Sequence, residues 1–328
     1  MTGFRFVVKA HAMSEHSAEV VFRPTSDALA YLPEGPCQYG PGQVSWVAIQ
    51  HGGDSREGSI NVLDLASGEN RHYVLPGRPG FAFPTDNPSV FLTGLERKVG
   101  FFDVESASWV GTFGEVEGEE EGTIINDGVI CGNGVLFGTK DVAFTDPKAG
   151  LYLWLPGMNV VTHLRGGQTC SNGKVILLRE GGSYLLDIDT PTKVVVEYPF
   201  DLENQRLGDP RTVVDLQEVD AYPDGMVITP DEKSVIIAIY NPNDVESGEA
   251  RQHSLANGEL EAVWKTPGSP RVTCPLLAEI AGEAVLLLTT AVEHMSAEEQ
   301  ARHPNAGCLF QAATPFGGMA AVERLEVP

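Results

Sequence analysis

Short apolar runs alternate with polar or glycine-rich breaks along the whole chain. Six segments share one pattern, in which a polar or kinked start is followed by a strand, a tight turn and a second strand. They begin at Pro33, Phe81, Asn126, Asn172, Asp224 and Cys274. The stretches between them hold apolar runs of five to eight residues, and such lengths are typical of β-strands. The pattern predicts an all-β protein.

The six segments recur at a nearly constant spacing. The steps are 92, 46, 52 and 50 residues when counted through Glu34, Asn126, Asn172, Asp224 and Cys274. Phe81 lies near the middle of the first step, which is therefore two repeats long. A four-stranded propeller blade takes roughly 40 to 50 residues. We therefore expect a six-bladed β-propeller, with four antiparallel strands per blade and residues 1–328 in a single domain.

The two ends of the chain carry strand-like runs that belong to no other blade. These runs are AEVVFRP near the N-terminus and GCLFQAATP and AAVERLEVP near the C-terminus. An open ring would leave a sheet edge exposed, and closure removes that edge. The sequence predicts that the N- and C-terminal strands pair within one blade and close the ring.

The composition of the chain argues against nucleic acid and membranes as binding partners. The formal net charge of −23 disfavours binding to nucleic acid or anionic lipid. No apolar run approaches the ~20 residues that cross a bilayer, and the N-terminus lacks a secretory apolar core and cleavage site. We expect a cytoplasmic protein whose partner is a small molecule. The oligomeric state is left open.

The five cysteines are an odd number and include no CxxC pair. They are expected to be reduced thiols. Cys37, Cys170 and Cys274 fall near the starts of repeated segments, where small buried side chains would pack a narrow channel. A redox or zinc role is the alternative.

Equivalent positions of a propeller repeat converge on one axis, so the polar starts of four segments are candidates for a shared site. They are Glu34, Asn126, Asn172 and Asp224. Two carboxylates and two amides suit a hard cation such as calcium or magnesium, and zinc also accepts carboxylate oxygen. The alternative is that NDG, SNG and PDG are ordinary turn formers.

An ordered set of motifs extends over the chain: PEGP, IINDG, GT, CSNG, PDGM and VTC, beginning at Pro33, Ile124, Gly138, Cys170, Pro223 and Val272. In this order and spacing the set resembles the gluconolactonase/regucalcin (senescence marker protein) family. The resemblance implies a six-bladed propeller that binds one divalent metal ion and hydrolyses lactones.

Residue roles follow from this resemblance. It implies that Glu34, Asn172 and Asp224 are metal ligands, with calcium as the first expectation and zinc or magnesium as alternatives. It makes Asn126 a group that faces substrate or a metal-bound water, and Asp224 the candidate general base. A held cation would polarise a lactone carbonyl and activate water. The expected reaction is hydrolysis of a sugar-lactone-like or related carboxylic ester.

The chain also departs from the family pattern. Ile124 stands where the family has a substrate-contacting arginine, and only Asp141 of GTKDVAF could replace an acidic lid residue. The segment after CSNG carries REGG instead of the usual SPDG turn. These changes favour a different lactone or ester, including a less polar one.

Two other functions are compatible with the same scaffold. The loss of the arginine and the acidic stretch EVEGEEEG at 115–122 suit a non-catalytic propeller that binds calcium or a protein partner. Six-bladed scaffolds also carry condensation and phosphotriester hydrolysis, because fold does not determine function.

Overall fold

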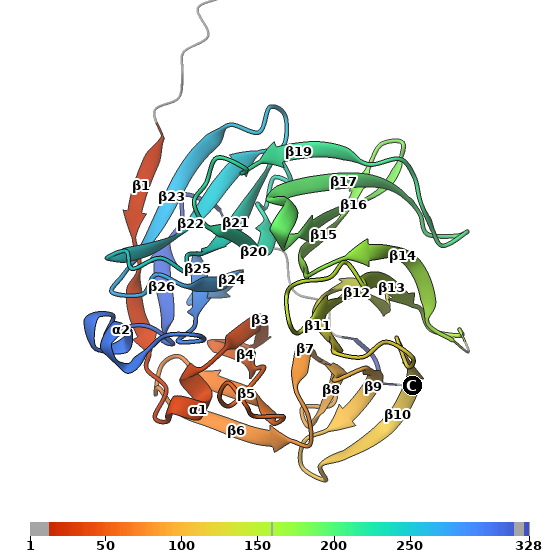
Figure 1. Ribbon diagram of the computed structural model, residues 1–328, viewed down its shortest axis with the longest axis horizontal. Coiled ribbons are helices and arrows are strands. Elements are labelled where there is room, and N and C mark those ends of the chain that lie inside the picture. Colours follow the sequence, from red (N-terminus) through yellow and green to blue (C-terminus); the bar gives the residue numbers. More distant parts are fainter. Residues whose placement is uncertain (1–12, 159, 318–324, 328) are drawn as a thin grey trace, which may run out of the picture.

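A computed structural model of the protein describes residues 13–158, 160–317 and 325–327. Six antiparallel sheets stand around one axis like the blades of a propeller (Figure 1). The innermost strands of neighbouring blades contact one another in a ring. The predicted six-bladed, four-stranded architecture is confirmed.

The first three blades follow the chain order from the innermost strand outward. Blade 1 contains β3 (Pro33–Gly40), β4 (Gln43–Ala48), β5 (Gly58–Asp64) and β6 (Asn70–Leu75). Blade 2 contains β7 (Pro79–Pro84), β8 (Val90–Leu95), β9 (Lys98–Asp103) and β10 (Ser108–Glu115). Blade 3 contains β11 (Thr123–Cys131), β12 (Gly134–Asp141), β13 (Ala149–Trp154) and β14 (Thr162–Gln168).

The other three blades carry the irregular additions. Blade 4 contains β15 (Ser171–Arg179), β16 (Gly182–Asp189), β17 (Val194–Asp201), β18 (Arg206–Leu207) and β19 (Arg211–Asp215). Blade 5 contains β20 (Tyr222–Ile228), β21 (Ser234–Tyr240), β22 (Ser247–Ser254), β23 (Leu260–Pro267) and β1 (Ser14–Ser17). Blade 6 contains β24 (Val272–Ile280), β25 (Glu283–Thr290), β26 (Leu309–Ala313) and β2 (Glu19–Phe22).

Helices are short and lie in the connections. They are α1 (Asp27–Ala30), α2 (Ala297–Arg302) and a 3₁₀ turn, η1 (Thr190–Thr192). A capping box between Ser296 and Glu299 begins α2, which satisfies two backbone N–H groups that the first helical turn leaves free. In the described ranges no helix has the length and apolar character needed to cross a membrane.

Both chain ends help to close the ring. The N-terminal strand β2 pairs with β26, as expected, and β1 pairs in parallel with β23 of the adjacent blade. The described part of the second C-terminal run, residues 325–327, does not join this blade, which corrects the sequence-based expectation for AAVERLEVP. Its residue Leu325 bridges to Thr85 of blade 2 instead, and residues 320–324 and 328 of this run lie outside the described part of the chain.

Apolar side chains fill the interfaces between blades. Six clusters of buried residues occur in the described ranges, and each joins two neighbouring blades. Trp46 lies between blades 6 and 1 and Trp264 between blades 5 and 6, both almost fully buried. Since each sheet packs on both faces, the blades hold the inner strands at a fixed distance from the axis.

A β-bulge interrupts every inner strand close to its start. The pairing register shifts after Glu34, Pro79, Ile125, Asn172, Pro223 and Val272. The NDG, SNG and PDG sequences therefore lie inside β11, β15 and β20, and the alternative that they form turns is wrong. Because a bulge bends the strand and re-aims the adjacent side chain, it can direct polar groups toward the axis.

Glycines follow the bulged residues because adjacent inner strands approach closely there. A Cβ atom on Gly173 would lie 2.6 Å from the Cβ of Met226. A Cβ on Gly225 would lie 2.6 Å from the Sγ and 2.8 Å from the Cα of Cys274. The glycines are required here by lack of space between blades.

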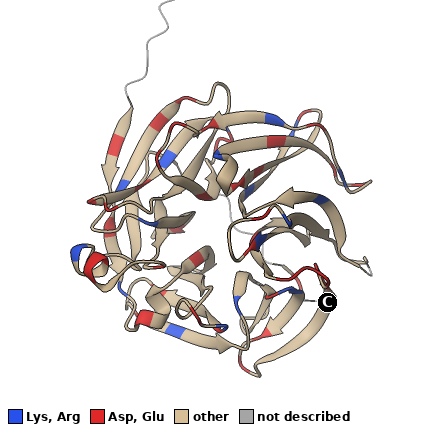
Figure 2. Ribbon diagram, viewed as in Figure 1, with Lys and Arg blue, Asp and Glu red and all other residues tan. Residues whose placement is uncertain are grey.

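The acidic stretch 115–122 forms the end of β10 and the connection to β11 (Figure 2). The Arg97 guanidinium donates hydrogen bonds to the carbonyl oxygens of Glu117 (3.1 Å) and Glu120 (2.9 Å). The Glu117 carboxylate accepts hydrogen bonds from Thr139 (2.6 Å) and Tyr152 (2.9 Å). The loop is therefore tied to blades 2 and 3 by its backbone and by one inward carboxylate.

The close approach of the inner strands leads to a stability prediction. Gly225→Ala should destabilise the protein by about 2 kcal/mol, because overpacking a filled interface forces backbone shifts. Gly111→Ala is the matched control, since a Cβ on this strand glycine meets no atom within 4 Å. Denaturant unfolding of both variants measures the difference. Equal stability of the two variants would contradict the packing argument.

Candidate active site

A pocket of about 290 Å³ lies where the inner strands begin. All four predicted residues line it: Glu34, Asn126, Asn172 and Asp224. A second cavity, of about 350 Å³, is lined by later residues of the same strands, so the two cavities occupy opposite ends of the channel. The predicted convergence of the four side chains at one end is thus observed in the geometry.

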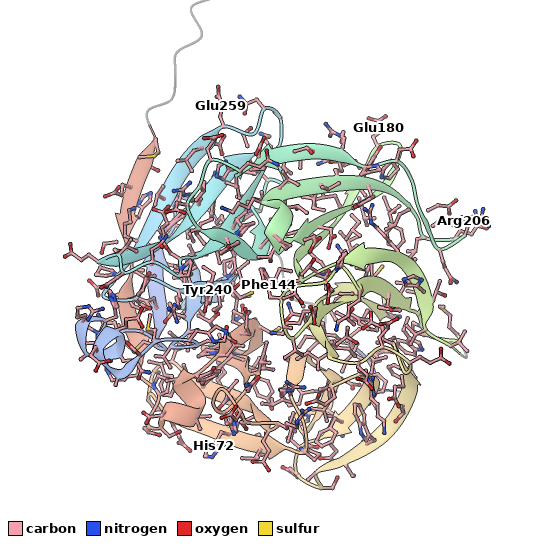
Figure 3. The ribbon with its side chains drawn as sticks, in the orientation of Figure 1. His72, Phe144, Glu180, Arg206, Tyr240 and Glu259 are labelled. Carbon is pink, nitrogen blue, oxygen red and sulfur yellow. The ribbon has the colours of Figure 1, made fainter. Side chains whose placement is uncertain are left out.

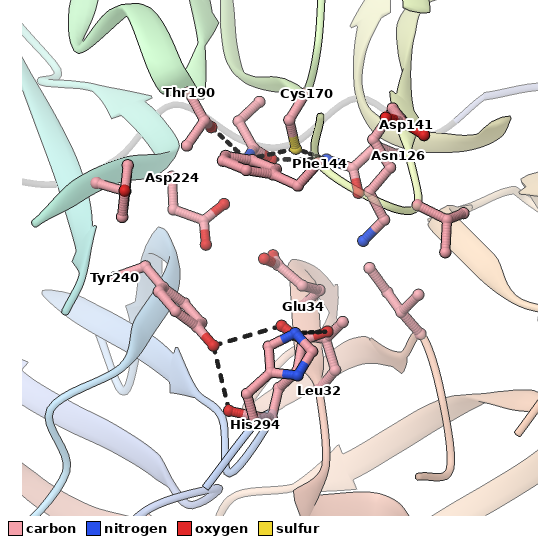
Figure 4. A pocket seen from close by; sticks show the side chains of 16 residues that line it. Leu32, Glu34, Asn126, Asp141, Phe144, Cys170, Thr190, Asp224, Tyr240 and His294 are labelled. Carbon is pink, nitrogen blue, oxygen red and sulfur yellow. Dashed lines mark hydrogen bonds and ion pairs between the residues drawn. The ribbon is translucent and has the colours of Figure 1, made fainter. Parts of the chain in front are cut away.

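Glu34 of β3 and Asp224 of β20 point toward each other across the pocket (Figure 4). Glu34 accepts one hydrogen bond, from the N–H of Gly35 at 3.1 Å. Within the described ranges, the Asp224 carboxylate has no hydrogen-bond or ion-pair partner, although it is only 8% exposed. Two acidic groups therefore share one small volume, and neither forms an ion pair with a side chain of the described ranges.

This arrangement perturbs both carboxyl groups. Burial raises the pKa of Glu34 to about 8, and the charge of Asp127 adds to the increase. Burial, and then the charge of Glu34, raises the pKa of Asp224 well above its ordinary value. Since neither carboxylate has an ion-pair partner within the described chain, one proton is favoured on the pair, because two like charges in a low-dielectric site repel.

A chain of hydrogen bonds orients the two amides. Asn126 donates both Nδ2 hydrogens within the protein, to Asn172 Oδ1 at 2.7 Å and to the Ser171 carbonyl at 2.9 Å. Asn172 donates from Nδ2 to Thr190 Oγ1 at 2.8 Å, and Thr190 donates to the Pro223 carbonyl at 3.0 Å. The chain links blades 3, 4 and 5, so Asn126 has no N–H left for a substrate. Its Oδ1 is the available atom.

A buried lysine two residues after Asn172 holds the backbone of β15 in place. Lys174 is 4% exposed, and its Nζ donates to the Asn172 carbonyl at 2.8 Å. The same Nζ lies 3.5 Å from Asp187 Oδ1. A buried ammonium is stable only with partners of this kind, so Lys174 is committed to holding the inner strand of blade 4.

The donor set fits a divalent cation. Glu34 and Asp224 supply carboxylate oxygens, and the Asn172 Oδ1 retains a second lone pair beside its hydrogen bond. Hard cations such as calcium take oxygen ligands of this kind. No group of three or more His, Cys, Asp or Glu side chains suited to a metal occurs in the described ranges. A cation here thus depends on the Asn172 amide as third donor.

The cysteines do not extend this donor set. All five are free thiols. Burial raises the pKa of both Cys37 and Cys170 to about 12 and the pKa of Cys274 well above its usual range. Because a thiolate is the form that binds metal or reacts, these protonated thiols act as packing groups near the channel.

The loop after β12 covers the pocket. The Asp141 carboxylate accepts hydrogen bonds from the backbone N–H groups of Thr145 and Asp146, both at 2.9 Å, and lies 3.2 Å from Lys148 Nζ. These contacts hold the pKa of Asp141 well below its usual range. Asp141 therefore organises the loop and is not free to act as an acidic lid residue.

Phe144 lies on this loop near the centre of the ring (Figure 3). Its backbone has φ of +55°, a left-handed conformation that is uncommon for a bulky residue. Its ring meets Tyr222 edge-on, with ring centroids 6.0 Å apart. Together with Leu32, Ile49 and Val142, the two aromatic rings give the pocket an apolar wall.

Sequence reasoning missed several residues of this site. Thr190, Lys140 and Phe144 line the pocket, and none of them stands in a repeated motif. Tyr240 donates a hydrogen bond to the Glu293 carbonyl at 3.2 Å on the opposite side. The only signal was position, because Lys140 follows the GT motif directly and Phe144 ends the same GTKDVAF stretch.

Comparisons with known proteins identify relatives of this chain. A regucalcin from Agrobacterium tumefaciens, described as a calcium-binding protein, superposes with a TM-score of 0.75 over 94% of this chain and 99% of that one, at 20% identity. An L-arabinolactonase from Azospirillum brasilense is 26% identical over 251 residues, which are 76% of this chain and 78% of the relative.

A regucalcin from Danio rerio is 26% identical over 202 residues, covering 59% of this chain and 63% of the relative. The structural likeness, at this identity, supports the fold alone. Residues 32–292 match the family described as SMP-30/Gluconolactonase/LRE-like region, and this match extends over most of the ring. The chain therefore belongs to the SMP-30/gluconolactonase/LRE-like family.

Proposed function

We propose that this protein hydrolyses a lactone with the aid of a divalent cation held by Glu34, Asn172 and Asp224. Membership of the family, with a relative named L-arabinolactonase, supports lactone hydrolysis in general terms. The observation that carries the finer proposal is that the Glu34 and Asp224 carboxylates face each other in one pocket and that neither forms an ion pair within the described chain. A divalent cation would balance their charge.

Asp224 and Asn126 have different roles in the proposed reaction. When bound, a divalent cation polarises a carbonyl group and lowers the pKa of nearby water. Asp224 accepts the proton of the attacking water, since no group of the described chain hydrogen-bonds to its carboxylate. Asn126 positions Asn172 through the 2.7 Å hydrogen bond, and its Oδ1 accepts a hydrogen bond from a substrate hydroxyl.

The reaction balances without another reagent. The water oxygen bonds to the lactone carbonyl carbon, and the bond between that carbon and the ring oxygen breaks. The proton taken by Asp224 returns to the departing ring oxygen, giving a hydroxy acid. The loop carrying Phe144 lies over the pocket and limits the access of bulk water.

Calcium is the first candidate for the cation, on the chemistry of the oxygen donors and on the description of the regucalcin neighbour as calcium-binding; zinc and magnesium are the alternatives. The cytoplasmic location expected from the sequence stays a prediction.

The second candidate function is a non-catalytic propeller that binds calcium or a partner. The specific observation that favours it is Ile124, which is buried and offers no polar group to a substrate. Cation-dependent stabilisation without hydrolysis of any lactone would support this function over the first.

Replacing the proposed base tests the chemistry. Asp224→Asn should lower kcat/KM by about 100-fold or more, the usual effect of losing a general base, on whichever member of an aldonolactone, homoserine lactone and aromatic lactone panel the wild type hydrolyses. Chelation with EDTA should have a similar effect. Asp209→Asn, at an exposed loop position, is the control. Full activity in Asp224→Asn would exclude its role as base.

The raised pKa of Glu34 predicts how stability varies with pH. In EDTA the folded state keeps a proton that the unfolded chain loses, so stability should fall as pH rises from about 4.5 toward 8. By pH 8 the loss attributable to Glu34 should be on the order of 4 kcal/mol, since its pKa is raised from 4.5 to about 8. Thermal unfolding across this range, with and without calcium, measures it.

Glu34→Gln should flatten this pH dependence in EDTA and weaken stabilisation by calcium. The exposed Glu259→Gln is the matched control and should behave like the wild type. If Glu34→Gln and the wild type lose the same stability between pH 5 and 8, the pKa of Glu34 is not raised in the folded state as predicted.

A further inference from the structure

Lys140 brings an ammonium group into the pocket. It lies on β12 directly opposite Ile124 of β11, and directly opposed residues of paired strands point to the same side of a sheet. Its backbone also bridges to Cys170, at the edge of blade 4. The lysine is half-buried and lines the pocket together with Glu34 and Asp224.

The Lys140 ammonium has no hydrogen-bond or ion-pair partner within the described ranges. Other half-buried or buried lysines are committed: Lys174 donates to the Asn172 carbonyl at 2.8 Å, and Lys193 to the Val219 carbonyl at 2.8 Å. Lys148 donates to the Glu121 carbonyl at 2.7 Å. A partly desolvated cation that faces a pocket without a partner is poised for a ligand.

The positive charge of Lys140 affects the pKa values of the two carboxylates proposed to hold the cation. The Lys140 ammonium acts to lower the pKa of both Glu34 and Asp224. It does not offset their burial, since both carboxyl groups keep a raised pKa. Lys140 is therefore a neighbour of the carboxylate pair and not its salt-bridge partner.

The carboxylates of the pocket pair with groups other than this lysine. On the proposed function, a divalent cation balances Glu34 and Asp224. Asp141 is balanced by Lys148 at 3.2 Å. Glu293 accepts a hydrogen bond from the Tyr240 hydroxyl at 3.4 Å and lies 3.8 Å from the His294 ring. Lys140 then carries a positive charge that no pocket carboxylate is bound to.

We propose that Lys140 is a specificity-determining residue that binds a carboxylate substituent of the substrate. The preferred substrate is then a lactone that already bears a carboxylate group, with its ring carbons against Phe144 and Tyr222. This inference rests on the proposed lactone hydrolysis at the same site, and it names the class of lactone.

The test compares lactones that differ in one charge. The pair is 5-oxotetrahydrofuran-2-carboxylate and 5-(hydroxymethyl)dihydrofuran-2-one, each assayed with calcium. Wild type should prefer the carboxylate, and Lys140→Met should reduce that preference about 10-fold or more, the usual loss for a charge-assisted hydrogen bond. Lys140→Arg should retain most of it. Lys98→Met, at an exposed lysine, should leave it unchanged.

A second arm measures binding without turnover. Calorimetry with tetrahydrofuran-2-carboxylate and tetrahydrofurfuryl alcohol reports the same charge preference on rings that cannot be hydrolysed. The preference should be lost in Lys140→Met and kept in Lys140→Arg, with thermal unfolding used to check that each variant is folded.

The outcomes separate this inference from the proposed function. Lactone hydrolysis with an unchanged charge preference in Lys140→Met, or an equal loss on both lactones, would overturn the role of Lys140 alone. The equal loss would mean that Lys140 acts on a group common to every lactone. Lysine-dependent binding of the carboxylate ring ether without any hydrolysis would support Lys140 and overturn the lactonase proposal.

Discussion

The repulsion between Glu34 and Asp224 is the constraint on which the centre of this protein depends. The buried Asp224 and the half-buried Glu34 carboxylates face each other without an ion-pair partner in the described chain, and this arrangement is unfavourable in a low-dielectric site. The rest of the ring has to hold them there. Six apolar interfaces between blades provide the rigidity, and closure through β2 and β26 prevents the first and last blades from separating.

The β-bulges of the inner strands direct polar side chains into the channel and so form the site. Each inner strand changes register near its start, so a side chain that would lie against the next blade is redirected toward the axis. Glycines 128, 173 and 225 accompany three of these bulges, because a larger residue would collide with the neighbouring strand. Packing and site geometry are thus two consequences of the same local feature.

The polar residues of the pocket fall into two groups. Some are already hydrogen-bonded within the protein and support the site, and the others are available to a ligand. The side chains of Asp141 and Thr190 are hydrogen-bonded to backbone groups, as is that of Lys174 in the cavity at the other end of the channel. Glu34, Asp224 and Lys140 have few or no partners within the described chain. The available set has both signs of charge, and that combination suits a cation together with a substrate that carries negative charge.

The sequence by itself determined the ring and most of the candidate ligands. Blade number followed from the repeat spacing, because each blade is a local unit of consecutive strands, and convergence of Glu34, Asn126, Asn172 and Asp224 followed from their equivalent repeat positions. Tertiary structure alone decided the bulges, the crossing of Leu325 to blade 2 and the use of Asp141 as a loop anchor.

Tertiary structure also decided which side chains remain free. In the sequence, Lys140 is indistinguishable from a surface lysine, and Asn126 is predicted only to face substrate or a metal-bound water. Whether an ammonium or an amide forms its hydrogen bonds within the protein depends on which groups from other blades lie within about 3 Å of it. Those neighbours are far away along the chain, so no local pattern reports them.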